Sequence, residues 1–256
     1  MLTNIIDTHS HYDSEAFDTD RYQLLDSLFE KNISAIIHAG VDIPSSEFGI
    51  ETARRYPKFY TSVGFHPEYA SGVTEEDMAR LRQLARADKV VAIGEIGLDY
   101  HYEGYDREAQ IKLFREQVTL AGELDLPIII HSRDAMEDTL EILRELRPKG
   151  VMHCYSGSAE TARELLDLGL YISMTGVLTF KNAKKSVKVL EMLPLDRFML
   201  ETDCPYMAPE PNRGKRCDSS LIPDTARKAA EVKGISYEEL VAATKENAIR
   251  LFGLDI

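Results

Sequence analysis

The chain has 256 residues, a formal net charge of −13 and an apolar content of 44%. A chain of this length and composition can bury a large core, so an intrinsically disordered protein is excluded. The negative charge also disfavours broad, salt-driven binding to nucleic acids, so an anionic substrate would need a local positive patch.

No apolar run approaches the roughly 20 residues that a membrane-spanning helix requires, and the first residues lack the basic start and long apolar segment of a signal peptide. The chain has three cysteines, an odd number that argues against a disulfide framework. We therefore expect a cytoplasmic protein that does not contact a membrane. The sequence gives no sign of an obligate protein partner.

Short apolar segments alternate with amphipathic segments along the whole chain. The apolar segments predict strands at Asn4–His9, Ser34–Ala39, Phe59–Gly64, Val90–Gly94, Pro127–Ile130, Gly150–His153, Leu170–Met174 and Arg197–Leu200. The segments between them predict helices, among them Thr74–Ala87, Arg107–Leu124, Ala135–Arg147 and Ala159–Leu168. Thr74 and Ser236 each carry a helix-start signal, and the last helix is expected to run to about Phe252, before Gly253.

The eight predicted strand ends, from His9 to Asp203, are about 28 residues apart on average, which suits one strand plus one helix. Eight such units, with strands too apolar to face water on one side, predict an α/β fold of the (β/α)8 TIM-barrel type with one domain over residues 1–256. The structural alternative is an open doubly wound sheet, although no glycine-rich phosphate loop follows any strand. The stretch Pro205–Pro223 is expected to be a long loop after the eighth strand.

Glu95 stands at the end of the apolar run Val90–Gly94, where the pattern calls for a hydrophobic residue. An isolated buried carboxylate costs several kcal/mol unless a cation meets it. Its neighbours in sequence offer no Lys or Arg. A distant part of the chain, or a metal ion, is expected to supply the positive charge.

The carboxyl-terminal strand ends of a barrel meet at one face, where catalytic groups lie. A single histidine after an apolar run is usually structural, but four imidazoles and two carboxylates at five strand ends are hard to explain as accidents. Imidazole with carboxylate suits Zn, Mn, Fe or Ni, and six ligands exceed the need of one tetrahedral zinc. Two divalent metal ions that share a carboxylate fit better. The candidate ligands are His9, His11, Glu95, His131, His153 and Asp203.

Six motifs occur in order over nearly the whole chain. They are Asp7-Thr8-His9-Ser10-His11, Gly64-Phe65-His66-Pro67, Gly94-Glu95-Ile96-Gly97-Leu98-Asp99-Tyr100, His131-Ser132-Arg133-Asp134, His153-Cys154-Tyr155-Ser156-Gly157 and Glu201-Thr202-Asp203-Cys204-Pro205-Tyr206. Together they resemble the TatD family of metal-dependent nucleases, a branch of the amidohydrolase-type barrels. The resemblance implies a (β/α)8 barrel, two divalent ions (Zn, Mn or Mg) and hydrolysis of phosphodiester bonds in DNA, often from the 3′ end of single strands.

The resemblance also implies roles for the candidate ligands. His9 and His11 would hold one ion with Asp203 beside it, the two other histidines would hold the second, and Glu95 would bridge both. A hydroxide held by the ions would be the nucleophile, and Asp203 would accept its proton. Asp203 and Glu95 are therefore the expected catalytic residues.

The resemblance and the residue types suggest four substrate-binding residues. His66 would lie near the substrate, or make a structural hydrogen bond before its proline. Arg133 would hold a phosphate, or pair with a neighbouring acidic residue. Tyr100 and Tyr206 would stack on bases, or pack against the barrel.

Basic residues in the loops after the seventh and eighth strands would contact phosphates or form a solvated face; they are Lys181, Lys184, Lys185, Arg213, Lys215 and Arg216. The chain has Cys217 where the family usually has asparagine, which is expected to affect the loop or the substrate preference. An exposed Cys217 would also be open to oxidation.

These observations leave three functions open. The first is a metal-dependent hydrolase that cleaves DNA, acting as a 3′–5′ exonuclease on single strands. The second is a barrel hydrolase that uses the same chemistry on a small ester, lactone, amide or aminoacyl-tRNA. The third is a non-catalytic binding or scaffold protein, which the complete set of predicted ligands disfavours.

Overall fold

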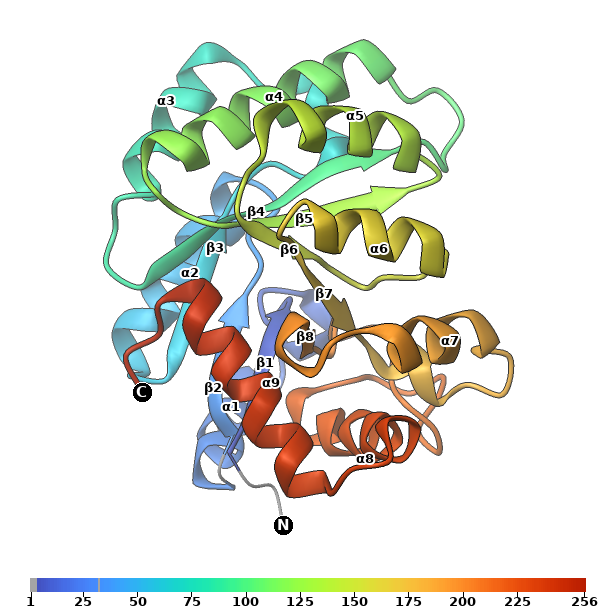
Figure 1. Ribbon diagram of the computed structural model, residues 1–256. Coiled ribbons are helices and arrows are strands. Elements are labelled where there is room, and N and C mark those ends of the chain that lie inside the picture. The colour runs from blue at the N-terminus through green and yellow to red at the C-terminus, as the bar shows by residue number, and fades with distance from the viewer. Residues whose placement is uncertain (1–3, 32) are drawn as a thin grey trace. The chain divides into compact units, whose positions relative to one another are not determined.

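The computed structural model describes residues 4–31 and 33–256. Eight parallel strands alternate with helices, and their order in the sheet follows their order in the chain, which confirms the predicted (β/α)8 barrel (Figure 1). The strands are β1 (Ile5–Ser10), β2 (Ile33–His38), β3 (Phe59–Val63), β4 (Val90–Asp99), β5 (Ile128–Arg133), β6 (Gly150–Met152), β7 (Tyr171–Met174) and β8 (Phe198–Leu200).

The α-helices are α1 (Arg21–Glu30), α2 (Ile43–Arg55), α3 (Glu75–Leu84), α4 (Arg107–Glu123), α5 (Met136–Leu146), α6 (Ala159–Asp167), α7 (Lys184–Met192), α8 (Ile222–Lys233) and α9 (Tyr237–Phe252). Thr74 and Ser236 cap α3 and α9 as predicted, and Gly253 ends α9 with a φ of 63°. Within residues 4–31 and 33–256, none of the helices is both long and apolar enough to cross a membrane.

The prediction that the fourth strand ends at Gly94 is wrong. Strand β4 continues to Asp99 and is buried along its whole length, so Glu95 lies inside the strand and not at its end. The pairing of β4 with β5 shifts register between Ile93 and Ile96 and then continues to Asp99. Gly97 explains why the pairing can continue: its φ is +150°, and a side chain there would collide with the carbonyl of His131.

The loop predicted at Pro205–Pro223 is shorter than expected. A 3-10 helix forms at Ser219–Leu221, and α8 begins at Ile222. The side chain of Asp218 caps the 3-10 helix by accepting from the N–H of Ser220. The loop after β8 therefore ends at Asp218.

Contacts between Cα atoms divide the chain into two units, and a single domain over residues 1–256 stays a prediction. Unit 1 comprises residues 1–38, 153–167 and 171–256, of which 4–31 and 33 onward are described. Its strands pair in the order β7, β8, β1, β2, where β8 and β1 meet through a bridge between Ser10 and Cys204. Helix α9 packs against β1 and β8 (Figure 1).

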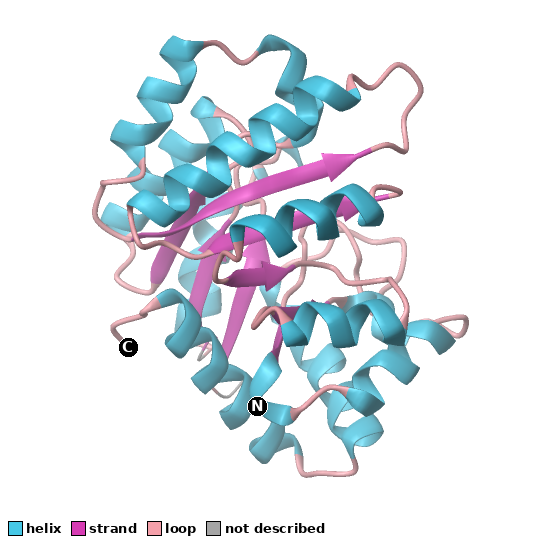
Figure 2. Cartoon of the chain, turned by 45° about the horizontal axis from the view of Figure 1, so that its top comes forward, coloured by secondary structure: helices cyan, strands magenta, loops and turns pink. Residues whose placement is uncertain are grey.

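Unit 2 comprises residues 39–152 and 168–170. Its strands pair in the order β3, β4, β5, β6, all parallel. Helix α4 packs against β4, the long strand in Figure 2. Both faces of β4 are covered, which accounts for its near-continuous apolar sequence.

Gly97→Ala is expected to destabilise the protein by at least about 3 kcal/mol, because the methyl group meets backbone at a φ that L-residues avoid. Gly104→Ala is the matched control, since Gly104 also has a positive φ but nothing lies within 4 Å of its Cβ position; its cost should be only about 1–2 kcal/mol. Urea denaturation measures both. Equal losses would contradict the close approach at Gly97.

Candidate metal centre

The end of β1 continues to pair with the chain beyond β8. The N–H of Asp203 donates to the carbonyl of His9 (3.0 Å), and the N–H of His11 donates to the carbonyl of Cys204 (2.8 Å). This pairing places Asp203 beside the two histidines. Asp203 has a φ of 57°, so the chain turns at that residue and leaves the strand.

The side chains of His9, His11 and Asp203 converge on one point. The two Nε2 atoms are 3.1 Å apart, and Oδ1 of Asp203 lies 3.7 Å from His9 Nε2 and 3.4 Å from His11 Nε2. The three ligand atoms thus lie within 4.8 Å of one another. Two imidazoles and a carboxylate facing one point form a donor set that fits a divalent transition metal.

Two opposing effects act on the carboxyl of Asp203. Burial raises its pKa, but the hydrogen bond with His11 and the charges of the nearby histidines outweigh it, so the pKa is lowered overall. Asp203 is therefore a carboxylate at neutral pH, as a metal ligand or proton acceptor has to be.

His153 stacks on His9, with ring centroids 4.1 Å apart. Its Nδ1 lies 3.5 Å from Oε1 of Glu201, and that same oxygen accepts from the N–H of Cys154 (2.6 Å). A carboxylate behind one ring nitrogen orients the other nitrogen toward a metal. Sequence reasoning did not assign a role to Glu201. Glu201 lies two residues before Asp203, and residues two apart in an extended segment point to the same side. This spacing could have indicated that Glu201 faces the site.

Asp7 fastens β1 to the chain after β8. Its carboxylate accepts from the N–H of Thr202 (2.9 Å), the hydroxyl of Thr202 (2.6 Å) and the hydroxyl of Ser219 (2.6 Å). Burial raises the pKa of Asp7 to about 7, against the lowering effect of these hydrogen bonds. Ser219 in turn pairs with the hydroxyl of Tyr12 (2.7 Å). The network holds the backbone that carries His9 and Asp203.

Unit 2 contains a second group of candidate ligands. Nδ1 of His131 lies 2.8 Å from Oε1 of Glu95, and Nε2 of His66 lies 3.9 Å from the same oxygen. The ring centroids of His66 and His131 are 4.6 Å apart. Glu95 is 4% exposed, and both of these contacts join its carboxylate to an imidazole.

Asp99 joins this group although the sequence reasoning gave it no role. Its Oδ2 lies 3.1 Å from Nε2 of His131, and together with His66 and His131 it forms a set of ligand atoms within 4.8 Å of one another. Burial alone would raise the pKa of Asp99. Its hydrogen bonds with His131 and with the N–H of His101 outweigh that effect, so the pKa is lowered overall. The four-residue spacing from Glu95 would have revealed Asp99, had the strand been predicted to continue.

Two of the four predicted substrate-binding residues are engaged in contacts within unit 2. The hydroxyl of Tyr100 donates to Asp138 (2.6 Å), and its ring stacks on Tyr105 at 4.6 Å. The guanidinium of exposed Arg133 lies 5.3 Å above the ring of Tyr102 and donates to its hydroxyl (3.3 Å). Arg133 therefore contacts an aromatic ring and not the acidic neighbours considered above.

The other two differ in exposure. His66 lies in the unit 2 ligand group, next to Glu95. Tyr206 follows Asp203 in unit 1 and is 60% exposed, with its N–H donating to the carbonyl of Asp203 (2.9 Å). A tyrosine ring that is open to solvent can offer a face to a base.

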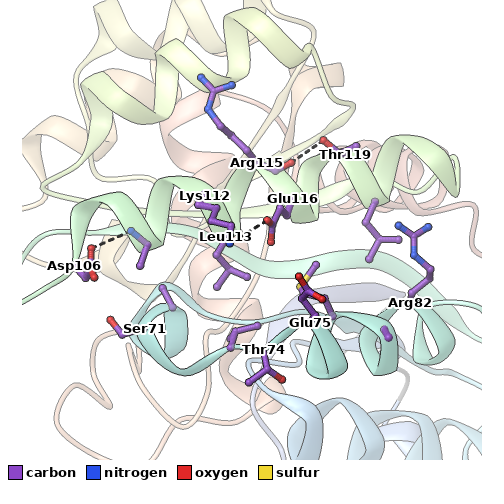
Figure 3. A pocket seen from close by; sticks show the side chains of 16 residues that line it. Ser71, Thr74, Glu75, Arg82, Asp106, Lys112, Leu113, Arg115, Glu116 and Thr119 are labelled. Carbon is purple, nitrogen blue, oxygen red and sulfur yellow. Dashed lines mark hydrogen bonds and ion pairs between the residues drawn. The ribbon is translucent and has the colours of Figure 1, made fainter.

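Figure 3 shows a cavity of about 710 Å³ in unit 2, between helices α3 and α4. Its lining contains none of the candidate ligands. Ion-paired and hydrogen-bonded side chains such as Lys112 with Glu116 line it (Figure 3). A smaller cavity of about 210 Å³ is lined by Asp99 and Tyr102 and so adjoins the unit 2 group.

The parallel (β/α)8 topology, with histidine and carboxylate groups at its strand ends, defines an amidohydrolase-like TIM-barrel hydrolase. Residues 6–253 match the family model described as TatD related DNase. The chain belongs to the TatD family and is a metal-dependent hydrolase of the TatD type.

Individual relatives agree with this assignment. The chain is 42% identical to an uncharacterized metal-dependent hydrolase, YabD of Bacillus subtilis strain 168, over 98% of this chain and 100% of that protein. It is 33% identical to the 3′-5′ ssDNA/RNA exonuclease TatD of Erwinia tasmaniensis, over 94% of this chain and 96% of that protein. The crystal structure of YJJV, a TatD homologue of Escherichia coli K12, superposes with a TM-score of 0.93 at 30% identity and covers all of both chains.

Removing divalent metal should lower the melting temperature, because a ligand that binds only the folded state stabilises it. A free metal concentration of about 100 times the dissociation constant stabilises the folded state by about 2.7 kcal/mol. For a chain of this size that corresponds to a shift of roughly 5–10 °C. Calorimetry with zinc, manganese or a chelator measures it. An unchanged melting temperature with each metal would contradict the metal centre.

Glu201→Gln is expected to weaken metal binding by about 10–100-fold, since the group that orients His153 loses its charge. The substituted amide still accepts from Cys154, so the fold should persist. Glu191→Gln, an exposed position on α7, serves as the control. Competition with a chromogenic chelator measures the affinity. Identical affinities of the two variants would show that Glu201 does not support the metal.

Proposed function

We propose that this protein is a metal-dependent nuclease that hydrolyses phosphodiester bonds of single-stranded DNA, acting from the 3′ end. The observation that carries the proposal is the convergence of His9, His11 and Asp203 on one point in a chain of the TatD family. The relative from Erwinia tasmaniensis named as a 3′-5′ ssDNA/RNA exonuclease supports the choice of substrate.

The proposed centre would hold two divalent ions. The carboxyl-terminal side of a (β/α)8 barrel supplies one catalytic face. On this basis, and with Glu95 coming from inside β4, we assign as its ligands His9, His11, Glu95, His131, His153 and Asp203. Glu95 is proposed as the shared carboxylate. Its Oε1 contacts His131 and lies near His66, so it is already held among imidazoles.

Bound divalent ions would neutralise charge on the phosphate and lower the pKa of a coordinated water. The remaining work falls to the protein's own side chains. Asp203 is ionised at neutral pH and accepts the proton of the attacking water at its carboxylate. Glu201 keeps His153 oriented, and the Asp7 network keeps β1 in register with Asp203.

Substrate binding is proposed for His66, Arg133, Tyr100 and Tyr206. Arg133 is exposed and can form paired hydrogen bonds with a phosphate. Tyr206 offers an open ring three residues after Asp203. Tyr100 contributes through its ring, because its hydroxyl is held by Asp138.

A hydrolase of a small ester, lactone, amide or aminoacyl-tRNA is the alternative, since the name metal-dependent hydrolase of the Bacillus relative specifies no substrate. A screen with single-stranded DNA, RNA, esters and lactones ranks the two functions. Intact nucleic acids in the presence of Mg, Mn and Zn would refute the nuclease.

Glu95→Gln should keep the fold yet lose at least one metal ion and nearly all turnover. The amide is nearly isosteric but cannot bridge two cations as a carboxylate does. Glu103→Gln, at an exposed position in the same unit, is the control. Metal content by mass spectrometry and release of nucleotides from labelled DNA are the measurements. A variant with two ions and full activity would disprove the bridge.

A further inference from the structure

We propose that the loops following β7 and β8, together with the first turn of α7, form a basic track that binds the phosphate backbone of a single-stranded nucleic acid and leads it to Asp203. This inference rests on the proposed nuclease function and adds the surface that holds the substrate beyond the cleaved bond. The basic track is defined by Lys181, Lys184, Lys185, Arg213, Lys215 and the ring of Tyr206.

Parts of the two loops, together with the first turn of α7, carry a local positive charge, whereas the remainder of the loop after β8 holds the acidic residues Glu201, Asp203 and Asp218. Segments 176–185 and 205–216 contain six basic residues and one acidic residue, Glu210, in a protein of net charge −13. A polyanion is repelled by most of such a protein. It would therefore be drawn to a surface where positive charge is concentrated.

The positive charges of the track are available to a ligand. Its five basic side chains belong to exposed residues, and none of them makes an ion pair among the described residues. Arg216 differs, because both of its terminal nitrogens donate to the carboxylate of Asp20 at 2.7 Å. We therefore leave Arg216 out of the track.

The position of Lys184 and Lys185 costs stability. They occupy the first turn of α7, which has no acidic residue there and no side-chain cap. Positive charges at a helix amino terminus are unfavourable by roughly 0.3–1 kcal/mol each. A phosphate beside them would reverse that effect.

Contacts between the two loops make them one surface. The guanidinium of Arg213 lies 4.2 Å above the ring of Phe180. The N–H of Glu210 donates to the hydroxyl of Thr179 (2.8 Å). Within the loop after β8, the N–H of Cys217 donates to the carbonyl of Pro205 (2.9 Å). The segments that carry Lys181 and Arg213 therefore lie next to each other.

The track begins at the candidate metal centre. Tyr206 is three residues from Asp203 and hydrogen-bonded to its carbonyl. Its ring and the neighbouring Met207 are exposed. Unpaired bases stack on such rings for about 1–3 kcal/mol each, whereas the bases of a duplex are already stacked on one another. Basic side chains combined with an open ring therefore fit a single strand.

The test compares a track variant, K181Q/K184Q/K185Q, with a control of equal charge change, K112Q/K149Q/K228Q. Each control lysine already pairs with an acidic residue, Glu116, Asp125 or Glu231. Cleavage of a thymidine decanucleotide and a dinucleotide is followed over a range of NaCl concentrations with the metal-loaded enzyme. Circular dichroism verifies that both variants are folded.

The wild type and the control should show the same steep loss of kcat/KM with salt. In the track variant the slope of log(kcat/KM) against log[NaCl] should become less negative by about 2, because each phosphate contact on a single strand contributes about 0.7. The preference for the decanucleotide over the dinucleotide should fall at least tenfold. Tyr206→Ala should reduce this preference further, and Tyr206→Phe should not.

Equal salt slopes and equal length preferences in the track variant and the control would overturn the track while leaving the nuclease intact. If the wild type cleaves neither oligonucleotide, the nuclease proposal fails. Binding of a fluorescent phosphorothioate decanucleotide then decides the track by anisotropy. Weaker, less salt-dependent binding by the track variant alone supports it, and identical binding by both variants overturns it.

Discussion

The candidate centre depends on the backbone pairing between the end of β1 and the chain that leaves β8. Two hydrogen bonds, from Asp203 to His9 and from His11 to Cys204, bring together ligands separated by almost two hundred residues in sequence. The buried carboxylate of Asp7 protects this pairing by accepting from Thr202 and Ser219. Buried polar groups of this kind are stable only when all partners are present, so the network also fixes the geometry of the site.

Both ligand groups are arranged with carboxylates behind or beside imidazoles. In unit 1, Glu201 orients His153 while Asp203 faces the other histidines. In unit 2, Glu95 and Asp99 contact opposite nitrogens of His131. Such pairs keep the rings from rotating, which reduces the reorganisation that metal binding requires. The candidate ligands thus lie within or directly beyond the strands, whereas the proposed substrate contacts Tyr100 and Tyr206 lie in loops.

Sequence patterns predicted the eight strands, the barrel and the helix caps at Thr74 and Ser236, because these depend on local periodicity and capping. Asp99 was missed for a different reason. The apolar run ends at Gly94, and only a close approach of two backbones at Gly97 lets the strand continue. Likewise, nothing local to Tyr100 shows that its hydroxyl is held by Asp138. A pattern in the linear sequence does not contain such contacts between distant segments.

Cys217 is buried, so the oxidation expected of an exposed Cys217 does not apply.

The length of β4 has a consequence for how related chains can vary. Glu95 and Asp99 reach the same imidazole because they are an even number of residues apart on one strand. Inserting or deleting one residue between them would turn one carboxylate toward the helices. The segment 95–99 should therefore tolerate no change in length, and side-chain exchanges should be confined to Ile96 and Leu98. The exposed stretch 101–106 that follows has no such constraint, and insertions that distinguish one relative from another are expected there.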